Sequence, residues 1–464
     1  MKSPRLRAHT LVAVAVAVFL LLLPLRLDAS SRLVRIGLET GVLSGRIDAS
    51  APIRVSDARG SFFVAGTAVT VESVAGRLLV NGKQVSIPAD FDSSQGFLRW
   101  NGKPYRGSLR VVPHGNGFSV VNVLDVESYL RGVLKIEVNP DWPMEALKAQ
   151  AVIARTYALR QAGRHGAEGF DLCTTTHCQA YRGMAAENPK LDRAIAETRG
   201  IVVVYGSALA QTYYFADGAG WTADVSSVWG GGTPYLTCRP EPVSYETPHS
   251  RWRASLTQEA LQKIMNALKQ PVGSILEIRA LQRDPGNRVT LLEVKGTSGS
   301  ATVKGHSFRM AAGSNLIRST LFDVAPAFGA SSSTDPALKR PAETKSPTES
   351  QEEDPLIVLT RQGAFTSDEL MDMLLHPEKK SDYLRKALSK GEKGVAISLP
   401  APVQPASPTR FSGTVPPAFE FQGKGWGHGV GLSQWGAKAL AESGWSFEAI
   451  LGHYFPGTAL RAIP

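Results

Sequence analysis

Residues 141–162 read DWPMEALKAQAVIARTYALRQA, and this stretch carries the clearest helical pattern of the chain. Asp141 fits the N-cap position, and Pro143 falls in the expected first turn, where its missing N–H removes no intrahelical hydrogen bond. Small or apolar side chains then recur every three or four residues, as on the buried face of an amphipathic helix: Leu147, Ala151, Ala154 and Ala158. The stretch therefore predicts a helix over 141–162.

Strand-like segments lie on both sides of this helix. Residues 33–123 consist of short apolar stretches, such as 61–64 and 77–80, separated by Gly, Asn and Asp turns, and they predict a small N-terminal β-rich module. Further helices are expected at 189–198 and 257–269, and further strands at 201–205, 211–215, 275–281 and 288–294. This arrangement predicts the α+β class, with mixed sheets and a few helices.

Residues 330–416 break the pattern with serine and proline clusters and mixed charge runs. Such a composition buries too little apolar surface to offset chain entropy, so we expect a disordered or linker insertion. Docking by two short helical patches, 368–375 and 382–388, is the alternative. The predicted map is one domain in two parts, 31–329 and 417–464, split by the insertion.

The N-terminal residues resemble an export signal. Three basic residues precede an apolar run over 11–23, and small residues follow it, so residues 1–30 predict a secretory signal peptide. An uncleaved membrane anchor is the alternative, although the apolar run is shorter than the roughly 20 residues that span a bilayer. Either reading places the rest of the chain outside the cytoplasm, in the periplasm or cell wall, and only the anchor would contact the membrane.

The formal net charge of +10 favours a polyanionic partner. Nucleic acid is not expected, because no Lys/Arg run with interleaved aromatic residues occurs and an exported protein rarely meets nucleic acid. An anionic polymer of the cell envelope fits the charge better.

Glu137 is the first candidate for chemistry. It closes an apolar stretch just before a turn bounded by Pro140, so partial burial would raise its pKa and keep a proton available near neutral pH, as a general acid requires. A solvated carboxylate at an element boundary is the plain structural alternative. Arg155 lies on the small apolar face of the predicted helix, where a guanidinium needs a carboxylate partner, and Glu137 and Glu145 are the candidates.

A cluster of sulfur and imidazole ligands follows the helix. Cys173, His177 and Cys178 are closely spaced, with His165 upstream, and these ligand types suit tetrahedral zinc. Four protein ligands leave no open position, so the zinc would be structural and catalysis itself would need no cofactor. A disulfide between Cys173 and Cys178, or one that uses Cys238, is the alternative.

The glycine-rich run 423–436 is the third candidate. It does not predict a nucleotide site, because no βαβ unit precedes it. Its glycines instead permit tight turns and a close approach of the backbone to a ligand. His428 and Gln434 would offer hydrogen bonds to a sugar, and Trp426 and Trp435 would offer flat apolar faces, although core packing is the alternative for each tryptophan.

Four blocks of the sequence together resemble the SpoIID/LytB domain family, named after stage II sporulation protein D and an amidase enhancer. They are the segment 129–157, the run 177–181, Val228-Trp229-Gly230 with Pro234-Tyr235-Leu236, and the closing run 427–437. The resemblance covers roughly residues 34–462 without the insertion. It implies a lytic transglycosylase that acts on peptidoglycan glycan strands, with Glu137 catalytic, Arg155 supporting activity, Tyr235 near the substrate and zinc on the two Cys and two His.

The chain departs from the family pattern at residues 216–222 and at Thr237, which puts substrate contacts in doubt but leaves Glu137 and Arg155 in place. A single carboxylate suffices for a lytic transglycosylase, whereas a hydrolase of the usual kind needs a second one, for which Asp141 and Glu145 are the nearest candidates downstream. The main alternative is a non-catalytic wall-binding module that enhances a cell-wall amidase. A third reading is an exported scaffold that recruits partners through residues 330–416.

Overall fold

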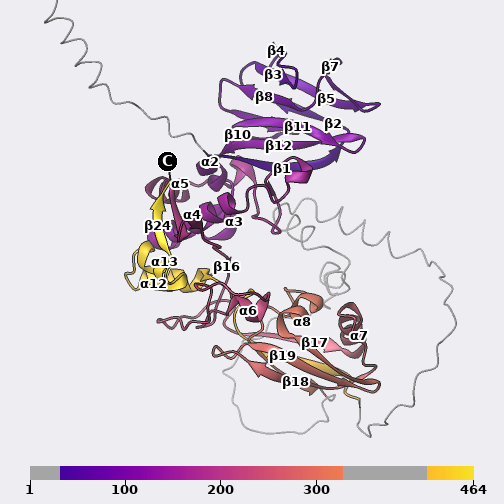
Figure 1. Ribbon diagram of the computed structural model, residues 1–464, viewed down its shortest axis with the longest axis vertical. Coiled ribbons are helices and arrows are strands. Elements are labelled where there is room, and N and C mark those ends of the chain that lie inside the picture. The colour runs from indigo at the N-terminus through magenta and orange to yellow at the C-terminus, as the bar shows by residue number, and fades with distance from the viewer. Residues whose placement is uncertain (1–31, 328–414, 464) are drawn as a thin grey trace, which may run out of the picture.

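The computed structural model describes residues 32–327 and 415–463. The predicted α+β class is confirmed, with several separate sheets and helices. Three regions follow one another along the long axis of the molecule: a β-rich N-terminal module, a mainly helical middle, and a third region of two small sheets with two helices (Figure 1). The C-terminal segment returns from the third region to the middle, so the middle is built from two separate segments of the described chain.

The N-terminal module consists of two sheets that share one apolar core. The first has the strand order β13-β1-β12-β11-β8-β3-β4, with bounds Leu172–Cys173, Leu33–Val42, Gly117–Asp125, Ser108–His114, Ala89–Ser93, Ile53–Asp57 and Phe62–Val64. The second has the order β10-β9-β2-β5-β6-β7, with bounds Lys103–Arg106, Phe97–Trp100, Ser44–Asp48, Ala68–Val74, Arg77–Val80 and Lys83–Val85. β13 contains Cys173, one of the predicted metal ligands, and its parallel pairing with β1 connects that segment to the N-terminal module.

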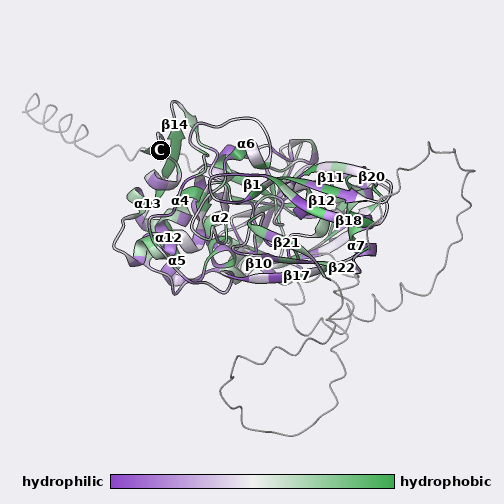
Figure 2. Cartoon of the chain, turned by 90° about the horizontal axis from the view of Figure 1, so that it is seen from below, coloured by the Kyte–Doolittle hydropathy of each residue, from purple (hydrophilic) through white to green (hydrophobic). Residues whose placement is uncertain are grey.

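The helical middle surrounds the helix predicted from the opening stretch. This helix is α4 (Met144–Arg160), and twelve of its residues, Arg155 among them, are buried. Around it lie α2 (Val126–Arg131), α3 (Leu134–Glu137), α5 (Pro189–Glu197), α6 (Val225–Val228), α12 (Gln434–Glu442), α13 (Phe447–Tyr454), two 3-10 turns (Gly166–Glu168 and Gly183–Ala186), and the short strands β14 (Ile201–Tyr205), β15 (Ala208–Leu209), β16 (Tyr214–Phe215), β23 (Leu432–Ser433) and β24 (Ala459–Ala462). The strand predicted at 201–205 is confirmed as β14, which is hydrophobic along its length (Figure 2) and pairs with the C-terminal β24.

The third region has its own apolar core. Its sheets have the orders β17-β22-β21 (Trp252–Thr257, Ala418–Gly423, Phe322–Ala327) and β18-β19-β20 (Ile275–Arg283, Val289–Gly296, Gly299–Lys304), with α7 (Gln258–Ala267) and α8 (Gly305–Ala312). In the antiparallel pair β21 and β22, Ala327 lies opposite Ala418. The chain therefore re-enters the fold beside the point where it left it, on the next strand of the same sheet.

Two details differ from the sequence prediction. The N-cap of α4 is Pro143 rather than Asp141, because the Asp141 amide instead donates to the Asn139 side chain in the preceding turn. The strand expected over 211–215 is confined to β16, since the Gln211 amide donates to the Tyr235 hydroxyl and the Thr212 hydroxyl donates to a carbonyl of α4. The first difference comes with a local turn at Asn139, whereas the second arises from contacts with distant segments.

Several predictions concern residues outside the described ones. The signal or anchor at 1–30 and the insertion at 330–416 fall there, apart from residues 415 and 416, so both stay predictions. Within the described residues, we find no helix with the length and hydrophobicity needed to cross a membrane.

Candidate active site

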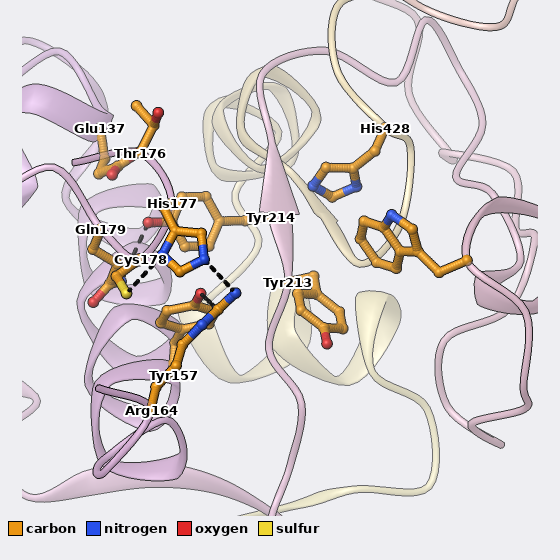
Figure 3. Close-up of a pocket in the computed structure, with 11 residues that line it drawn as sticks. Glu137, Tyr157, Arg164, Thr176, His177, Cys178, Gln179, Tyr213, Tyr214 and His428 are labelled. Atoms are coloured by element: carbon orange, nitrogen blue, oxygen red, sulfur yellow. Dashed lines mark hydrogen bonds between the residues drawn. The ribbon is translucent and has the colours of Figure 1, made fainter. Parts of the chain in front are cut away.

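A cavity of about 460 Å³ opens where the helical middle meets the glycine-rich segment. Figure 3 shows the side chains that line it: Glu137, Tyr157, Arg164, Thr176, His177, Cys178, Gln179, Tyr213, Tyr214, Trp229 and His428. In this view Glu137 and His428 lie on opposite sides, with Tyr214 between them. The volume is in the range of sites that hold small ligands.

Glu137 is the one carboxylate among the lining residues. It ends α3, and the backbone then turns into the extended Val138, so the side chain is partly buried but reaches the cavity. Burial raises the pKa of Glu137 to about 7, and hydrogen bonds from the Tyr214 side chain and the Ala180 backbone offset only part of this rise. Glu137 is therefore able both to give up and to take back a proton near neutral pH.

A chain of hydrogen bonds positions Tyr214, which lines the same cavity as the acid. The buried Tyr129 hydroxyl donates to Gln179 at 3.2 Å, and the Gln179 amide donates to the Tyr214 hydroxyl at the same distance. The Tyr214 side chain also lowers the pKa of Glu137 in part, so it acts on the carboxyl directly. Because Gln179 has a partner on both sides, it fixes the position of the Tyr214 hydroxyl.

Gln434 also positions Glu137. Its side-chain amide donates to the Glu137 backbone carbonyl at 3.1 Å and lies 3.4 Å from the Gln150 side-chain oxygen. Gln434 is 8% exposed and does not line the cavity, so its expected contact with a sugar stays a prediction. Gln434 ties the C-terminal segment to the acid.

Arg155 does not reach the cavity. Its fully buried guanidinium forms a two-pronged ion pair with Glu127, at 2.9 and 2.7 Å, and also donates to two backbone carbonyls. Neither Glu137 nor Glu145 is the partner, contrary to the prediction. Glu145 instead accepts from Lys148 and from the Phe447 amide. Arg155 therefore acts on the shape of the middle region, without access to a ligand.

Tyr235 and Trp435 are also placed away from the cavity lining. Tyr235 is 4% exposed, and its hydroxyl accepts the Gln211 amide. Trp435 packs against Trp142, with 5.1 Å between the ring centroids. Both side chains pack in the fold around the site, and their expected contact with substrate stays a prediction.

His428 does line the cavity, as expected. Its Nδ1 accepts the Val430 amide at 3.1 Å, which assigns the ring proton to Nε2. Burial, and then the nearby Arg309 and His306, lower the pKa of His428 to about 3, so the ring is neutral at physiological pH. A neutral imidazole can hydrogen-bond to a sugar but supplies no second acid.

Sequence reasoning missed other residues of the lining, among them Arg164, Tyr213, Tyr214 and Trp229. Tyr157 was inside the quoted helix, and Trp229 was inside a quoted block, but neither position predicts that a side chain points into a cavity. Tyr213 and Tyr214 stand shortly before residues 216–222, where the chain departs from the family pattern. This pair of aromatic residues was the one feature of the sequence that could have pointed to the lining.

The four predicted ligands come together beside this cavity. One ligand atom from each of His165, Cys173, His177 and Cys178 lies within 4.8 Å of all the others. Tetrahedral zinc, with bonds of about 2.0–2.1 Å to nitrogen and about 2.3 Å to sulfur, separates its ligand atoms by about 3.4–3.8 Å. The observed distances are 3.7 Å from Cys173 Sγ to His177 Nδ1, 3.6 Å from Cys178 Sγ to the same atom, and 3.4 Å from Cys178 Sγ to His165 Nε2.

The surroundings of the cluster also fit a metal. The second ring nitrogen of His165 contacts the Glu168 carboxylate at 2.6 Å, a pairing that orients metal-ligating histidines. Burial opposes ionisation of Cys173, but hydrogen bonds, mainly from Thr175, lower the pKa of this thiol to about 6. All three cysteines of the chain are free thiols in the structure.

Residues 114–205 match the family model described as SpoIID, Stage II sporulation protein. This segment contains Glu137, all of α4 and the four-ligand cluster. The family resemblance predicted from the sequence is thereby confirmed, and the fold and site define an α+β protein with a SpoIID-type segment that places one carboxylate in the cavity.

Three relatives carry the comparison further. The chain is 39% identical to an uncharacterized protein of Brachyspira hyodysenteriae over 171 residues, which cover 36% of this chain and 46% of the relative. It is 28% identical to the amidase enhancer of Bacillus subtilis over 393 residues, 78% of this chain and 48% of the relative. It is 25% identical to stage II sporulation protein D of the same organism over 212 residues, 42% of this chain and 60% of the relative. The chain thus spans about half the length of the curated relatives it matches.

Proposed function

We propose that this protein is an exported lytic transglycosylase that cleaves the glycan strands of peptidoglycan. The observation that carries the proposal is the cavity with one carboxylate, Glu137, whose pKa lies near 7. The names of the relatives, an amidase enhancer and a sporulation protein, support a role in the cell wall. An extracytoplasmic location, in the periplasm or cell wall, agrees with the signal predicted at 1–30.

The proposed reaction uses Glu137 twice. The protonated carboxyl first donates its proton to the bridging oxygen, so that the glycosidic bond breaks and the leaving sugar departs as an alcohol. The carboxylate then accepts the proton of the 6-hydroxyl on the N-acetylmuramic acid ring, whose oxygen bonds to C1 and closes a 1,6-anhydro ring. Glu137 ends protonated, as it began, and water is not consumed.

The lining argues against hydrolysis of the usual kind. Inverting and retaining hydrolases need a second carboxylate at roughly 5–10 Å from the acid. Among the described residues, the two predicted candidates are both absent from the lining: Asp141 lies in the turn before α4, and Glu145 is bound to Lys148 and Phe447. Ring closure by the substrate's own hydroxyl removes the need for that carboxylate.

A second candidate function is enhancement of a cell-wall amidase without catalysis. The similarity to the amidase enhancer favours it, because that alignment covers 78% of this chain. The two proposals differ in whether the Glu137 carboxyl is required, because an enhancer would not need an acid. The scaffold reading loses support, since it required a closed site and the cavity is open to ligands of ordinary size.

The products distinguish these functions. Purified sacculi or isolated glycan strands digested with the protein should yield chains ending in 1,6-anhydro-N-acetylmuramic acid. Mass spectrometry detects these ends because they are lighter by one water than reducing ends. Reducing ends alone would establish a hydrolase, and uncut glycan together with a faster partner amidase would establish the enhancer.

We also propose that His165, Cys173, His177 and Cys178 hold one structural zinc ion. Two thiolates and two imidazoles are a closed tetrahedral set, so the metal would fasten the segment 165–178 and leave the proton transfers to Glu137. Because His177 and Cys178 also line the cavity, the bound metal would fix one of its walls.

We expect about one equivalent of zinc per chain after purification under reducing, metal-controlled conditions, and a lower melting temperature after chelation. Cys173→Ser should lose most of the metal. Cys238→Ser is the matched control, since Cys238 is a partly buried thiol outside the cluster and should leave the zinc content unchanged. Metal-free protein with a Cys173 to Cys178 disulfide in the mass spectrum would contradict the proposal.

A further inference from the structure

Trp229 combines exposure with a place in the cavity. It directly follows α6 and is 44% exposed, and it is the one exposed large hydrophobic residue of the described chain that lines this cavity. Exposing so much indole to water costs hydration free energy, on the order of 25 cal/mol for each Å². An exposed indole that lines a cavity therefore offers a flat apolar surface on which a ligand can pack.

Three rings from separate parts of the chain support the indole. The Tyr213 and His428 ring centroids lie 4.9 and 4.8 Å from that of Trp229, and the His306 ring meets it edge-on at 6.0 Å. Gly231, two residues further on, does not confine it, because a Cβ there would meet no atom within 4 Å. The indole is thus supported by neighbouring rings and keeps part of its surface free.

A pyranose ring suits such a surface. Its axial C–H groups form an apolar patch that packs on an indole, while its hydroxyl and acetamido groups stay at the edge for hydrogen bonds. Polar side chains of the same cavity, including Arg164 and Thr176, are available for those bonds. Because Trp229 packs against His428, it belongs to the side of the cavity opposite Glu137 (Figure 3).

We propose that Trp229 is the stacking platform of a sugar subsite, which holds one N-acetylhexosamine ring of the glycan strand across the cavity from Glu137. The inference rests on the proposed function for its substrate class and adds a residue that fixes where the strand lies. It replaces the tryptophans first expected in this role: Trp435 packs on Trp142, and Trp426 packs on His249 at 4.7 Å.

The third region takes part through His306 on α8. Burial, and then Arg309, lower the pKa of His306 to about 4, so its ring is neutral when it meets the indole. His306 is a positioning residue, since it touches Trp229 and is absent from the cavity lining. The subsite thus depends on a segment outside the SpoIID match at 114–205.

The test uses the full chain carrying Glu137→Gln, so that ligand is not consumed, with N-acetylglucosamine oligomers and isolated glycan strands as probes. We expect Trp229→Ala in this background to weaken binding about tenfold by calorimetry, and Trp229→Phe to stay within about threefold of the parent. In the active protein, Trp229→Ala should raise KM by a similar factor with kcat changed less than threefold. Tyr205→Ala is the matched control, because Tyr205 is also 44% exposed but lies on β14 outside the cavity.

His306→Ala should give a smaller rise in KM of the same kind, with the fold intact by circular dichroism. Equal binding by the Trp229→Ala and parent proteins would overturn the platform and leave the proposed function standing. If the Glu137→Gln protein binds neither probe, the proposed function fails, and the platform fails with it. A fall in kcat with KM unchanged would also overturn the subsite, because stacking on a ground-state sugar acts on binding.

Discussion

Glu137→Gln should reduce glycan cleavage by between about 100-fold and 10,000-fold, the usual contribution of a positioned acid or base. The amide keeps the shape of the side chain but cannot deliver a proton to the bridging oxygen. The fold should survive, since Gln434 binds the backbone carbonyl of residue 137, which the substitution leaves in place. Cleavage rates on isolated glycan strands, with binding measured in parallel, check this prediction.

The control is Glu259→Gln, the same chemical change at a carboxylate paired only with Lys263 on the surface. It should cleave at the native rate. Native activity in the Glu137→Gln protein would rule out the acid/base role, whereas loss of both binding and melting cooperativity would show that residue 137 serves the fold.

The pH dependence follows from the raised pKa of Glu137. The first proton transfer needs the protonated acid, so kcat/KM should fall as pH rises above about 7. Because the pKa in the folded state exceeds the ordinary value of 4.5, the folded protein binds this proton more tightly than the unfolded chain. The contribution of this proton to the free energy of unfolding is fully present below pH 4.5 and is lost as pH rises through about 7. The melting temperature of the native protein should therefore decline relative to that of Glu137→Gln between pH 5 and pH 8.

The sequence predicted most of what depends on local pattern. The strands at 77–80 and 201–205 have the predicted bounds, and the helix around Leu147 differs only at its ends. The four residues with metal-binding side chains were also predicted from their spacing, because they all lie within residues 165–178. The burial of Glu137 followed from its place at the end of an apolar stretch.

The side-chain positions that the sequence did not predict depend on contacts between distant segments. Glu127 lies 28 residues before Arg155, and nothing in the spacing shows that α2 packs against α4. Gln434 and Tyr235 carry the residue types of a sugar site, yet the Gln434 side chain donates to the Glu137 carbonyl and the Tyr235 hydroxyl accepts from the Gln211 amide. Trp229 faces the cavity because of rings contributed by three other segments, which no local pattern records.

Arg155→Ala should destabilise the fold by about 3–5 kcal/mol, the usual cost of breaking a buried ion pair by removing one partner. The guanidinium is fully buried, and its loss would leave the Glu127 carboxylate paired only with the Gly200 amide. The Ile195 and Ile201 carbonyls, at the end of α5 and the start of β14, would also each lose one hydrogen bond. Arg155→Lys should lie in between, because an ammonium cannot reproduce the two-pronged contact. Denaturant unfolding measures both values.

The role of Arg155 in activity can then be separated from its role in stability. Arg193→Ala is the control, since Arg193 is an exposed partner of Glu197, and such a pair contributes about 0.3–0.5 kcal/mol. Glu127→Gln combined with Arg155→Met should cost less than the sum of the single changes, because the two side chains act as one unit. At a temperature where Arg155→Lys is fully folded, its kcat and KM on glycan strands should stay within about threefold of native. A lysine variant that is as stable as the native protein but fails to cleave would contradict this account, and would show that the guanidinium acts on the reaction through something other than the packing of α2, α4 and α5.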